Sequence, residues 1–418
     1  MSLSQVQALA ARSVADVASG HNLADSLAEL SAQHPELSAQ DKGMLQDIAY
    51  GVQRHLGSLK FMLGKLLNKP LTHPEIESLL LVALYQLRHT RNAPHAVVNE
   101  AVNHIGSIGR GQYRSFANAV LRRFQREKDM LTAQCKQDDT ARYNLPNWLK
   151  ACLQRQHPQH WHNIVTAFAQ KPPLTLRVNR RKSTPENYLA ELAAAGIGAK
   201  SLGGAAIRLD DALPVQQIPG FAEGRVSVQD YGAQQAALLL APKDGERILD
   251  ACSAPGGKTG HILELADCSL TALDIDPARL QRVQDNLNRL GFQAALACAD
   301  AADTEKWYDG KPFDAVLADL PCTASGTAKR NPDVKWLRRP TDPDRTARQQ
   351  EPLLDALWRT LKPGGRMLLA TCSVFEEENR RQLQRFLSRH INAEPLEEQL
   401  LLPNDRQDGF YYALIRKF

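Results

Sequence analysis

Residues 313–326, which read FDAVLADLPCTASG, decide the fold of the C-terminal half of this chain. The apolar run at the start of the stretch predicts a buried parallel strand, and Asp319 and Cys322 follow where that strand ends. In open α/β sheets, ligands bind beyond the carboxyl ends of the strands. A carboxylate and a thiol in this position indicate an active site, although a free cysteine can equally be a small apolar filler of a core.

From Asp244 onward, apolar strands alternate with amphipathic helices, which is the pattern of a doubly wound parallel sheet. The expected strands occupy residues 247–251, 270–275, 294–298, 313–317, 367–371 and 411–415. We therefore expect residues 226–418 to form a Rossmann-like α/β domain.

The loop CSAPGGK, residues 252–258, follows the first of these strands and allows three interpretations. A phosphate-binding loop, G-x-x-x-x-G-K-[ST], needs a glycine where this chain has Cys252. The dinucleotide fingerprint G-x-G-x-x-G fails as well, because only Gly256 and Gly257 are present. S-adenosylmethionine carries an adenosine but no phosphate, so its loop needs only the close backbone approach that glycine permits. We favour this third interpretation.

Two carboxylates support a site for S-adenosylmethionine. Asp274 ends the second strand, 274 − 257 = 17 residues after Gly257, and in nucleotide-binding units an acidic residue about 20 residues on holds the ribose hydroxyls. Asp300 follows the third strand, where it can meet the adenine amino group; either residue alone could be a solvated loop carboxylate. The expected cofactor-binding residues are Cys252, Ser253, Ala254, Pro255, Gly256, Gly257, Lys258, Asp274, Asp300 and Asp319.

A second cysteine occupies the equivalent position on another strand. Cys372 follows the strand that ends at residue 371, so Cys372, Cys322 and Asp319 are expected at one edge of the sheet. Cytosine and uracil are poor nucleophiles at C5 and become reactive when an activated thiolate adds at C6. A carboxylate is the group that recognises the exocyclic amine of cytosine. The predicted catalytic residues are therefore Cys372, Cys322 and Asp319, and the residues alone do not say which thiol attacks.

The remaining residues divide into three regions by pattern. Residues 1–130 show helical periodicity throughout and predict an all-α domain. Residues 131–140 lose this periodicity and are expected to be a linker. Residues 141–225 combine short helices with strand-like runs, which predicts a small α+β region.

Three basic clusters are candidates for contacts with RNA phosphates. They lie at the last helix of the all-α domain, at the end of the strand-like run 174–179, and in the loop 328–348, where Trp336 offers a surface for base stacking. The alternative for each is an ordinary solvated face. Their basic residues are Arg110, Arg114, Arg122, Arg123, Arg126 and Lys128, then Arg177, Arg180, Arg181 and Lys182, and then Lys329, Arg330, Lys335, Arg338, Arg339, Arg345 and Arg348.

Composition restricts the class of protein. A chain of 418 residues is too long for one core and predicts two or three domains. The formal net charge of +5 permits an anionic partner without requiring one. Seven cysteines without a C-x-x-C pair argue against a disulfide framework or a zinc site, and we expect no metal. Without a signal peptide or an apolar stretch near the ~20 residues that a membrane span needs, we expect a cytoplasmic protein with no membrane contact.

Several motifs together resemble the Nol1/Nop2/Sun family of RNA cytosine-C5 methyltransferases. They are LDACSAPGGKT, ALDIDPARL, LADLPCTASG, KRNPDVKWLRR, ATCSVFEEEN and DGFYYALIRK. The all-α domain is similar to the antitermination factor NusB over DKGMLQDIAYGVQR and ALYQLRHTRNAPHAVVNEAV. The resemblance implies a NusB-like RNA-binding domain, an RRM-like middle region and S-adenosylmethionine as cofactor. It further implies small-subunit (16S) ribosomal RNA as substrate, Cys372 as the nucleophile and Cys322 as the group that assists product release. We expect a monomer.

Two other functions remain open at this stage. In a DNA cytosine-C5 methyltransferase the cysteine of the Pro-Cys motif, here Cys322, would attack; the helical RNA-type domain and the absence of a separate target-recognition domain argue against it. A non-catalytic RNA-binding assembly factor would keep the fold without the chemistry. The intact thiol pair, Asp319 and the complete cofactor loop argue against that.

Overall fold

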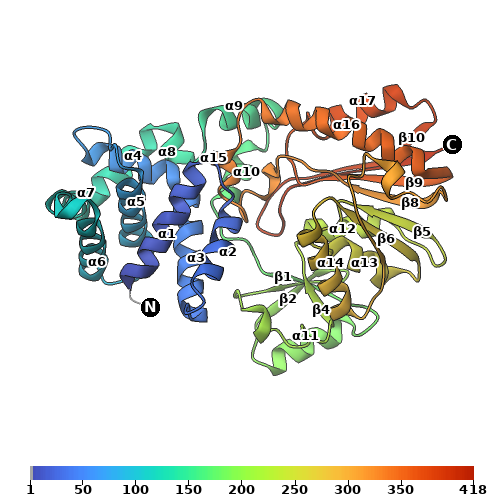
Figure 1. Ribbon diagram of the computed structural model, residues 1–418, viewed down its shortest axis with the longest axis horizontal. Coiled ribbons are helices and arrows are strands. Elements are labelled where there is room, and N and C mark those ends of the chain that lie inside the picture. Colours follow the sequence, from blue (N-terminus) through green and yellow to red (C-terminus); the bar gives the residue numbers. More distant parts are fainter. Residues whose placement is uncertain (1–2) are drawn as a thin grey trace. The chain divides into compact units, whose positions relative to one another are not determined.

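The computed structural model describes residues 3–418; Met1 and Ser2, and the side chains of Gly109 and Arg110, lie outside the description. The chain forms two compact units (Figure 1). Of the described residues, the first unit contains 3–169 and Ala328–Pro340, and the second contains Gln170–Thr327 and Thr341–Phe418. Arg110, one of the predicted basic residues, therefore receives no structural account.

The first unit is helical, as predicted. Apolar faces of its first seven α-helices share one core, in which Leu80 and Ala83 are fully buried. Helix starts follow local chemistry: Ser38 and Asp41 form a capping box at α3, and Pro74 and Pro94 are the first residues of α5 and α6. The helices are α1 (Leu3–Ala18), α2 (Leu23–Gln33), α3 (Ala39–Arg54), α4 (Leu56–Leu66), α5 (Pro74–His89), α6 (Pro94–Ser107), α7 (Arg114–Gln134), α8 (Asp139–Tyr143), α9 (Asn147–Gln156), α10 (Trp161–Phe168) and α15 (Val334–Leu337).

Residues 131–140, which we expected to be a linker, are mostly helical. Helix α7 continues to Gln134, a short 3₁₀ turn follows, and α8 begins at Asp139. Leu131 and Cys135 are buried in the helical core, and this packing outweighs the weak periodicity of the sequence. That the segment separates two domains stays a prediction.

The segment Ala328–Pro340 belongs to the helical unit although the sequence on both sides of it belongs to the second unit. At the C-terminal end of α3, Trp336 Nε1 donates to the Gln53 carbonyl at 2.8 Å, and Lys335 Nζ donates to the Arg54 carbonyl at 3.2 Å. A cation at the end of a helix, where carbonyls are unpaired, is favourable to the helix dipole. The segment therefore caps α3.

The same segment also caps α2, at the N-terminal end of that helix. Asp333 Oδ2 accepts from the backbone N–H of Leu23, the first residue of α2, at 3.1 Å. Lys329 and Lys335 are almost completely buried, and burial lowers the pKa of Lys335 to about 7. The expectation that this loop contacts RNA is thus wrong for Lys329 and Lys335, whose side chains are buried. Trp336 is partly buried against the helical core, and its contact with RNA stays a prediction.

The second unit begins with the small α+β region. Its four strands pair in the order β2-β3-β1-β4, with antiparallel neighbours. Helix α11 covers the sheet through Tyr188 and Leu192, which are buried with Leu176 and Ile207. The elements are β1 (Thr175–Val178), α11 (Pro185–Ala194), β2 (Ala199–Gly203), β3 (Ala206–Leu209) and β4 (Val226–Val228).

The C-terminal region forms a seven-stranded sheet in the order β10-β11-β9-β8-β5-β6-β7. Strands β9, β8, β5, β6 and β7 run parallel, whereas β11 is antiparallel to both of its neighbours. The predicted Rossmann-like sheet is confirmed, with an antiparallel edge. The strands are β5 (Arg247–Ala251), β6 (Ser269–Asp274), β7 (Ala295–Cys298), β8 (Phe313–Asp319), β9 (Leu361–Thr371), β10 (Ala393–Leu401) and β11 (Phe410–Lys417).

Helices cover both faces of this sheet (Figure 1). Along β8, Ala315 and Leu317 pack with α12, α13 and α14, whereas Val316 and Ala318 pack with α16 and α17. Burial on both faces explains why the strand is continuously apolar. The helices are α12 (Tyr231–Leu240), α13 (Gly257–Leu265), α14 (Pro277–Leu290), α16 (Asp342–Thr360) and α17 (Arg380–Arg389).

Candidate active site

The loop after β5 turns sharply at the carboxyl edge of the sheet. Gly256 adopts φ +92°, and a Cβ there would lie 3.1 Å from Val283 Cα, so this position needs glycine. The backbone N–H of Ser253 donates to the Leu273 carbonyl at 2.9 Å, which fixes the loop against β6. Ser253 is buried, and its Oγ has no hydrogen-bond partner among the described residues. The loop thus offers one unused polar group.

Asp274 and Asp300 lie at successive strand ends, as expected from the sequence. Asp274 is buried, and its carboxylate accepts from the backbone N–H of Ala254 at 3.1 Å and from that of Asp276 at 3.2 Å. Asp300 is exposed just beyond β7. Ile275 is 64% exposed between them in sequence, an unusual exposure for a large apolar side chain. The sequence analysis missed Ile275, although an apolar residue directly after the strand-end aspartate was a usable signal.

Lys258 and Asp319 form an ion pair, which the sequence analysis did not foresee. The Lys258 Nζ lies 2.5 Å from Asp319 Oδ2, and the two side chains are 15% and 27% exposed. Burial, the largest single cause, lowers the pKa of Lys258, but the charge of Asp319, the hydrogen bond to it and the charges of neighbouring groups together raise the net pKa. Below this pair, burial raises the pKa of the Asp250 carboxyl to about 7. The Lys258 side chain therefore holds Asp319 in place at the carboxyl end of β8.

The two predicted thiols meet at this edge. Cys322 follows β8, Cys372 follows β9, and their Sγ atoms are 3.5 Å apart. Both residues are partly exposed. The hydrogen bond to Cys372, followed by burial, raises the pKa of Cys322 well above the ordinary value. Cys322 is therefore a neutral thiol near neutral pH, a form that can hold or donate a proton.

The donor set suits S-adenosylmethionine. Carboxylates stand at two successive strand ends for hydroxyl and amino groups, an apolar side chain lies beside them, and the loop lacks the glycines of a phosphate cradle. The unpaired Ser253 Oγ supplies a further hydrogen-bonding group. Among the described residues, no cluster of His, Cys, Asp and Glu is arranged to hold a metal ion.

Arg177, which we assigned to RNA contacts, is part of the core. It is completely buried and pairs with Glu264, with Nη2 at 2.7 Å from Oε1 and Nε at 2.8 Å from Oε2. Its Nη1 donates to the carbonyl of Gly257 at 2.8 Å, and thus supports the cofactor loop. Arg180 is exposed and remains available for RNA. The assignment to RNA is therefore wrong for Arg177.

Arg177→Met is expected to destabilise the second unit by about 3–5 kcal/mol, because removing one partner of a buried ion pair leaves the other charge uncompensated. Arg180→Met is the matched control and should change the free energy of unfolding by less than about 0.5 kcal/mol. Denaturant unfolding of both variants measures the difference. A stable Arg177→Met protein with weakened RNA binding would restore the original assignment.

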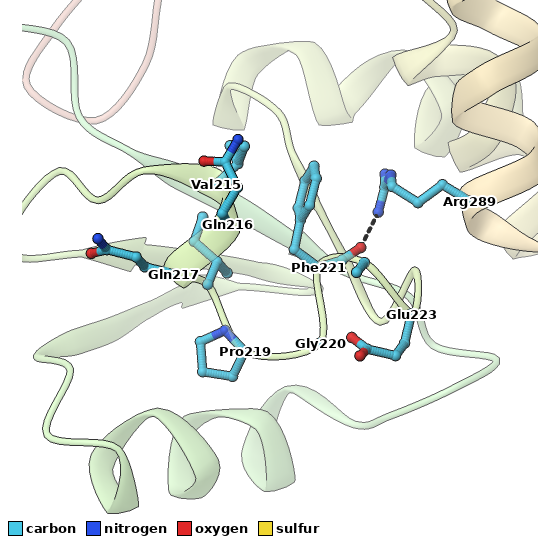
Figure 2. Close-up of a pocket in the computed structure, with 10 residues that line it drawn as sticks. Val215, Gln216, Gln217, Pro219, Gly220, Phe221, Glu223 and Arg289 are labelled. Atoms are coloured by element: carbon cyan, nitrogen blue, oxygen red, sulfur yellow. Dashed lines mark hydrogen bonds between the residues drawn. The ribbon is translucent and has the colours of Figure 1, made fainter. Parts of the chain in front are cut away.

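A second hollow lies in the small α+β region and is distinct from the predicted site. Residues 215–223 and Arg289 line a space of about 620 Å³. Figure 2 shows these lining residues. Arg289 Nη1 donates to the carbonyls of Phe221 at 2.7 Å and Val226 at 2.9 Å, and its guanidinium lies over the Phe221 ring. Because this arginine is engaged in holding the loop, we assign the hollow no part in the chemistry.

The fold and this site define a methyltransferase that uses S-adenosylmethionine. A family model described as 16S rRNA methyltransferase RsmB/F matches residues 237–416. A NusB family model matches residues 3–126, and a ferredoxin-like domain model of RsmF/B-like methyltransferases matches residues 145–216. The chain is 42% identical to the ribosomal RNA small subunit methyltransferase B of Salmonella dublin and to that of Escherichia coli O7:K1, over 99% of both chains in each case. The chain belongs to the ribosomal RNA small subunit methyltransferase B family.

Solved structures agree with this fold. The crystal structure of PH0851 has a TM-score of 0.82 at 23% identity and covers 100% of this chain and 99% of that one. A methyltransferase homolog protein from Pyrococcus horikoshii has a TM-score of 0.60 at 26% identity, over 67% of this chain and 98% of its own. Within residues 3–418, no helix has the length and apolar character needed to cross a membrane.

Proposed function

We propose that this chain methylates C5 of a cytosine in 16S ribosomal RNA through a covalent adduct between Cys372 and C6 of the base. The observation that carries the proposal is the pair of thiols with Sγ atoms 3.5 Å apart beside the Lys258–Asp319 ion pair. Binding a methyl donor does not by itself require two thiols. Addition of a thiolate to a pyrimidine ring does need a nucleophile, and release of the product needs a proton acceptor.

The two thiols have different roles in this proposal. The Cys372 thiolate forms a bond to C6, and the electron pair displaced from the ring makes C5 nucleophilic. Once C5 is methylated, its proton leaves to a base, the C6–S bond breaks, and the thiolate is regenerated. The raised pKa of Cys322 argues against it as the attacking thiolate. We assign Cys322 to the second stage: once the Cys372 sulfur is bonded to C6, the thiol–thiol hydrogen bond that raises the Cys322 pKa most is gone, Cys322 releases its proton to solvent, and its thiolate accepts the C5 proton.

Asp319 is proposed to recognise cytosine. As a carboxylate it accepts from the exocyclic amine, which uracil lacks, and this contact therefore provides specificity for the base. Lys258 holds the Asp319 carboxylate in place. S-adenosylmethionine, when bound, supplies an electrophilic methyl group. Residues 252–258 with Asp274 and Asp300 are proposed to hold it at the neighbouring strand ends.

RNA as the substrate is supported by the family and by one helix face. On α7, Arg114, Arg122 and Arg126 are exposed and recur at intervals of eight and four residues, which places them on one side of the helix. Such a stripe suits a phosphate backbone. The relatives from Salmonella dublin and Escherichia coli are ribosomal RNA small subunit methyltransferases by name.

The experiment is to identify the product. Unmodified 16S ribosomal RNA is incubated with the protein and methyl-labelled S-adenosylmethionine, digested to nucleosides and analysed by mass spectrometry. We expect the label in 5-methylcytidine, and expect none when DNA of the same sequence replaces the RNA. Label in another nucleoside would overturn the proposal, and label only in DNA would favour a DNA methyltransferase. Binding of the methyl donor without any transfer would favour an assembly factor.

A further inference from the structure

Glu378 is a fully buried carboxylate behind the two thiols. It accepts from the backbone N–H of Thr323 at 2.7 Å and from the Thr323 hydroxyl at 2.6 Å. It also accepts a short hydrogen bond from the Ser373 hydroxyl. A buried charge is costly unless it is well hydrogen-bonded, and these three donors satisfy that requirement. Glu378 is therefore fixed by the two segments that it contacts.

Those segments are the two cysteine loops. Thr323 directly follows Cys322, and Ser373 directly follows Cys372. One carboxylate thus bonds to the immediate neighbour of each thiol, although the thiols are 372 − 322 = 50 residues apart in sequence. Glu378 lies in the same connection between β9 and α17 as Cys372, in the turn before α17, so its bonds to Thr323 are the ones that cross to the other cysteine loop.

Further hydrogen bonds join the same loops. Ser325 Oγ lies 3.1 Å from Ser373 Oγ, and the backbone N–H of Gly326 donates to the Cys372 carbonyl at 2.9 Å. A Cβ at Gly326 would lie 2.9 Å from that carbonyl oxygen, so the loops approach more closely than any other residue would allow. These bonds are between neutral groups, whereas the Glu378 bonds are charge-assisted and hence stronger.

We propose that Glu378 is the positioning residue that sets the spacing between Cys322 and Cys372. Glu378 contacts neither the base nor the methyl donor, and it acts by clamping the two cysteine loops through Thr323 and Ser373. The kinetic part of this inference rests on the proposed function, because spacing matters to catalysis only if both thiols act on one base. The inference that Glu378 sets the spacing between the two thiols does not rest on the proposed function.

The carboxylate also distinguishes the thiols electrostatically. The hydrogen bond between the two thiols and burial raise the pKa of Cys322, and the negative charge of Glu378 raises it further. The clamp therefore supports a division in which the thiol after β8 keeps its proton.

The first experiment measures thiol spacing without any RNA. Phenylarsine oxide binds two neighbouring thiols, forming two As–S bonds while its oxygen leaves as water with both thiol protons. A pre-positioned pair binds more tightly than a mobile pair. We expect Glu378→Gln to weaken binding by about tenfold, because the neutral amide cannot accept from all three donors. Cys372→Ser defines the background from other cysteines.

Glu351→Gln is the matched control. Glu351 is also a carboxylate of the second unit, but it pairs with Arg385 at 2.9 Å between α16 and α17 and contacts neither cysteine loop in the described structure. This variant should bind the arsenical as the unchanged chain does. Equal affinity of the Glu378→Gln and Glu351→Gln proteins would overturn the clamp.

The second experiment measures methyl transfer. Glu378→Gln should lower kcat by on the order of 10- to 100-fold, as misplacement of reacting groups by about 1 Å does, with KM for RNA within about twofold because RNA contacts are untouched. An unchanged kcat, or an effect on KM alone, would contradict the proposal. If Glu378→Gln fails to fold, Thr323→Val removes one donor and decides the question: unchanged arsenical affinity and kcat would overturn the clamp.

The two experiments separate the clamp from the proposed function. If the unchanged chain makes no 5-methylcytidine but Glu378→Gln still weakens arsenical binding, the proposed function fails and the clamp holds. If the chain makes 5-methylcytidine and Glu378→Gln changes neither readout, the clamp fails and the function holds.

Discussion

Cys372→Ala is expected to abolish methyl transfer to 16S ribosomal RNA, with a loss of about 10³-fold or more, because an enzyme that loses its nucleophile keeps only binding and orientation. We do not expect Cys322 to replace it: the substitution removes the hydrogen bond to Cys372 that raises the pKa of Cys322 most, but burial and the charge of Glu378 still raise that pKa. The initial rate of label transfer from S-adenosylmethionine measures the effect.

The matched control for this prediction is Cys268→Ala. Cys268 is another free cysteine, packed against the core on one face of the sheet and remote in sequence from both cysteine motifs. It should retain the activity of the unchanged chain. A Cys372→Ala protein that still methylates at the full rate would refute the covalent role of Cys372. If instead Cys322→Ala is inactive and Cys372→Ala only impaired, the order of attack is that of a DNA cytosine-C5 methyltransferase.

Cys322→Ala is expected to trap the enzyme on its RNA. Cys372 still adds to the base, but without the neighbouring thiol the adduct is not resolved, so a covalent protein–RNA species accumulates. Turnover should fall by on the order of 10²–10⁴-fold, the usual range for losing a general acid or base. A band of reduced mobility on a denaturing gel, containing both RNA and protein, is the readout.

The double variant Cys322→Ala/Cys372→Ala is the control for the trapped species. It should give no such band, because it lacks the sulfur that forms the bond. Free turnover by Cys322→Ala without an adduct would instead return Cys322 to the role of a small core filler, which its half-buried position also allows.

The sheet and the position of the candidate site could both be predicted from the sequence, because both follow from the burial and direction of parallel strands. A strand buried on two faces is apolar throughout, and β8 and β9 each end at a polar or thiol residue. Parallel strands bring their carboxyl ends to one edge of the sheet. The sequence alone therefore predicted that Asp319, Cys322 and Cys372 lie close together. The 3.5 Å between the sulfurs depends on side-chain packing and could not be read from spacing.

The sequence could not predict the roles of residues whose partners are far away along the chain. Arg177 lies in a basic cluster, which is typical of an RNA contact. Its partner in a buried ion pair, Glu264, is 87 positions away in sequence, and this pair makes Arg177 a core residue. The role of Glu378 was missed for the same reason, because its bond to Thr323 joins residues 55 positions apart. Strand β10 was missed because its residues are largely exposed and acidic, and pairing with β11 rather than burial makes it a strand.

The path of residues 328–340 has a practical consequence for dividing the chain. A fragment starting at Gln170 would contain the whole second unit. It would also carry the indole of Trp336 and the side-chain amine of Lys335 without the end of α3 that accepts their hydrogen bonds. Modules joined by a simple tether can be exchanged or trimmed at the tether. Here residues 328–340 belong to the helical unit although they interrupt the sequence of the second, so a shortened version of the enzyme requires this segment to be redesigned along with the cut.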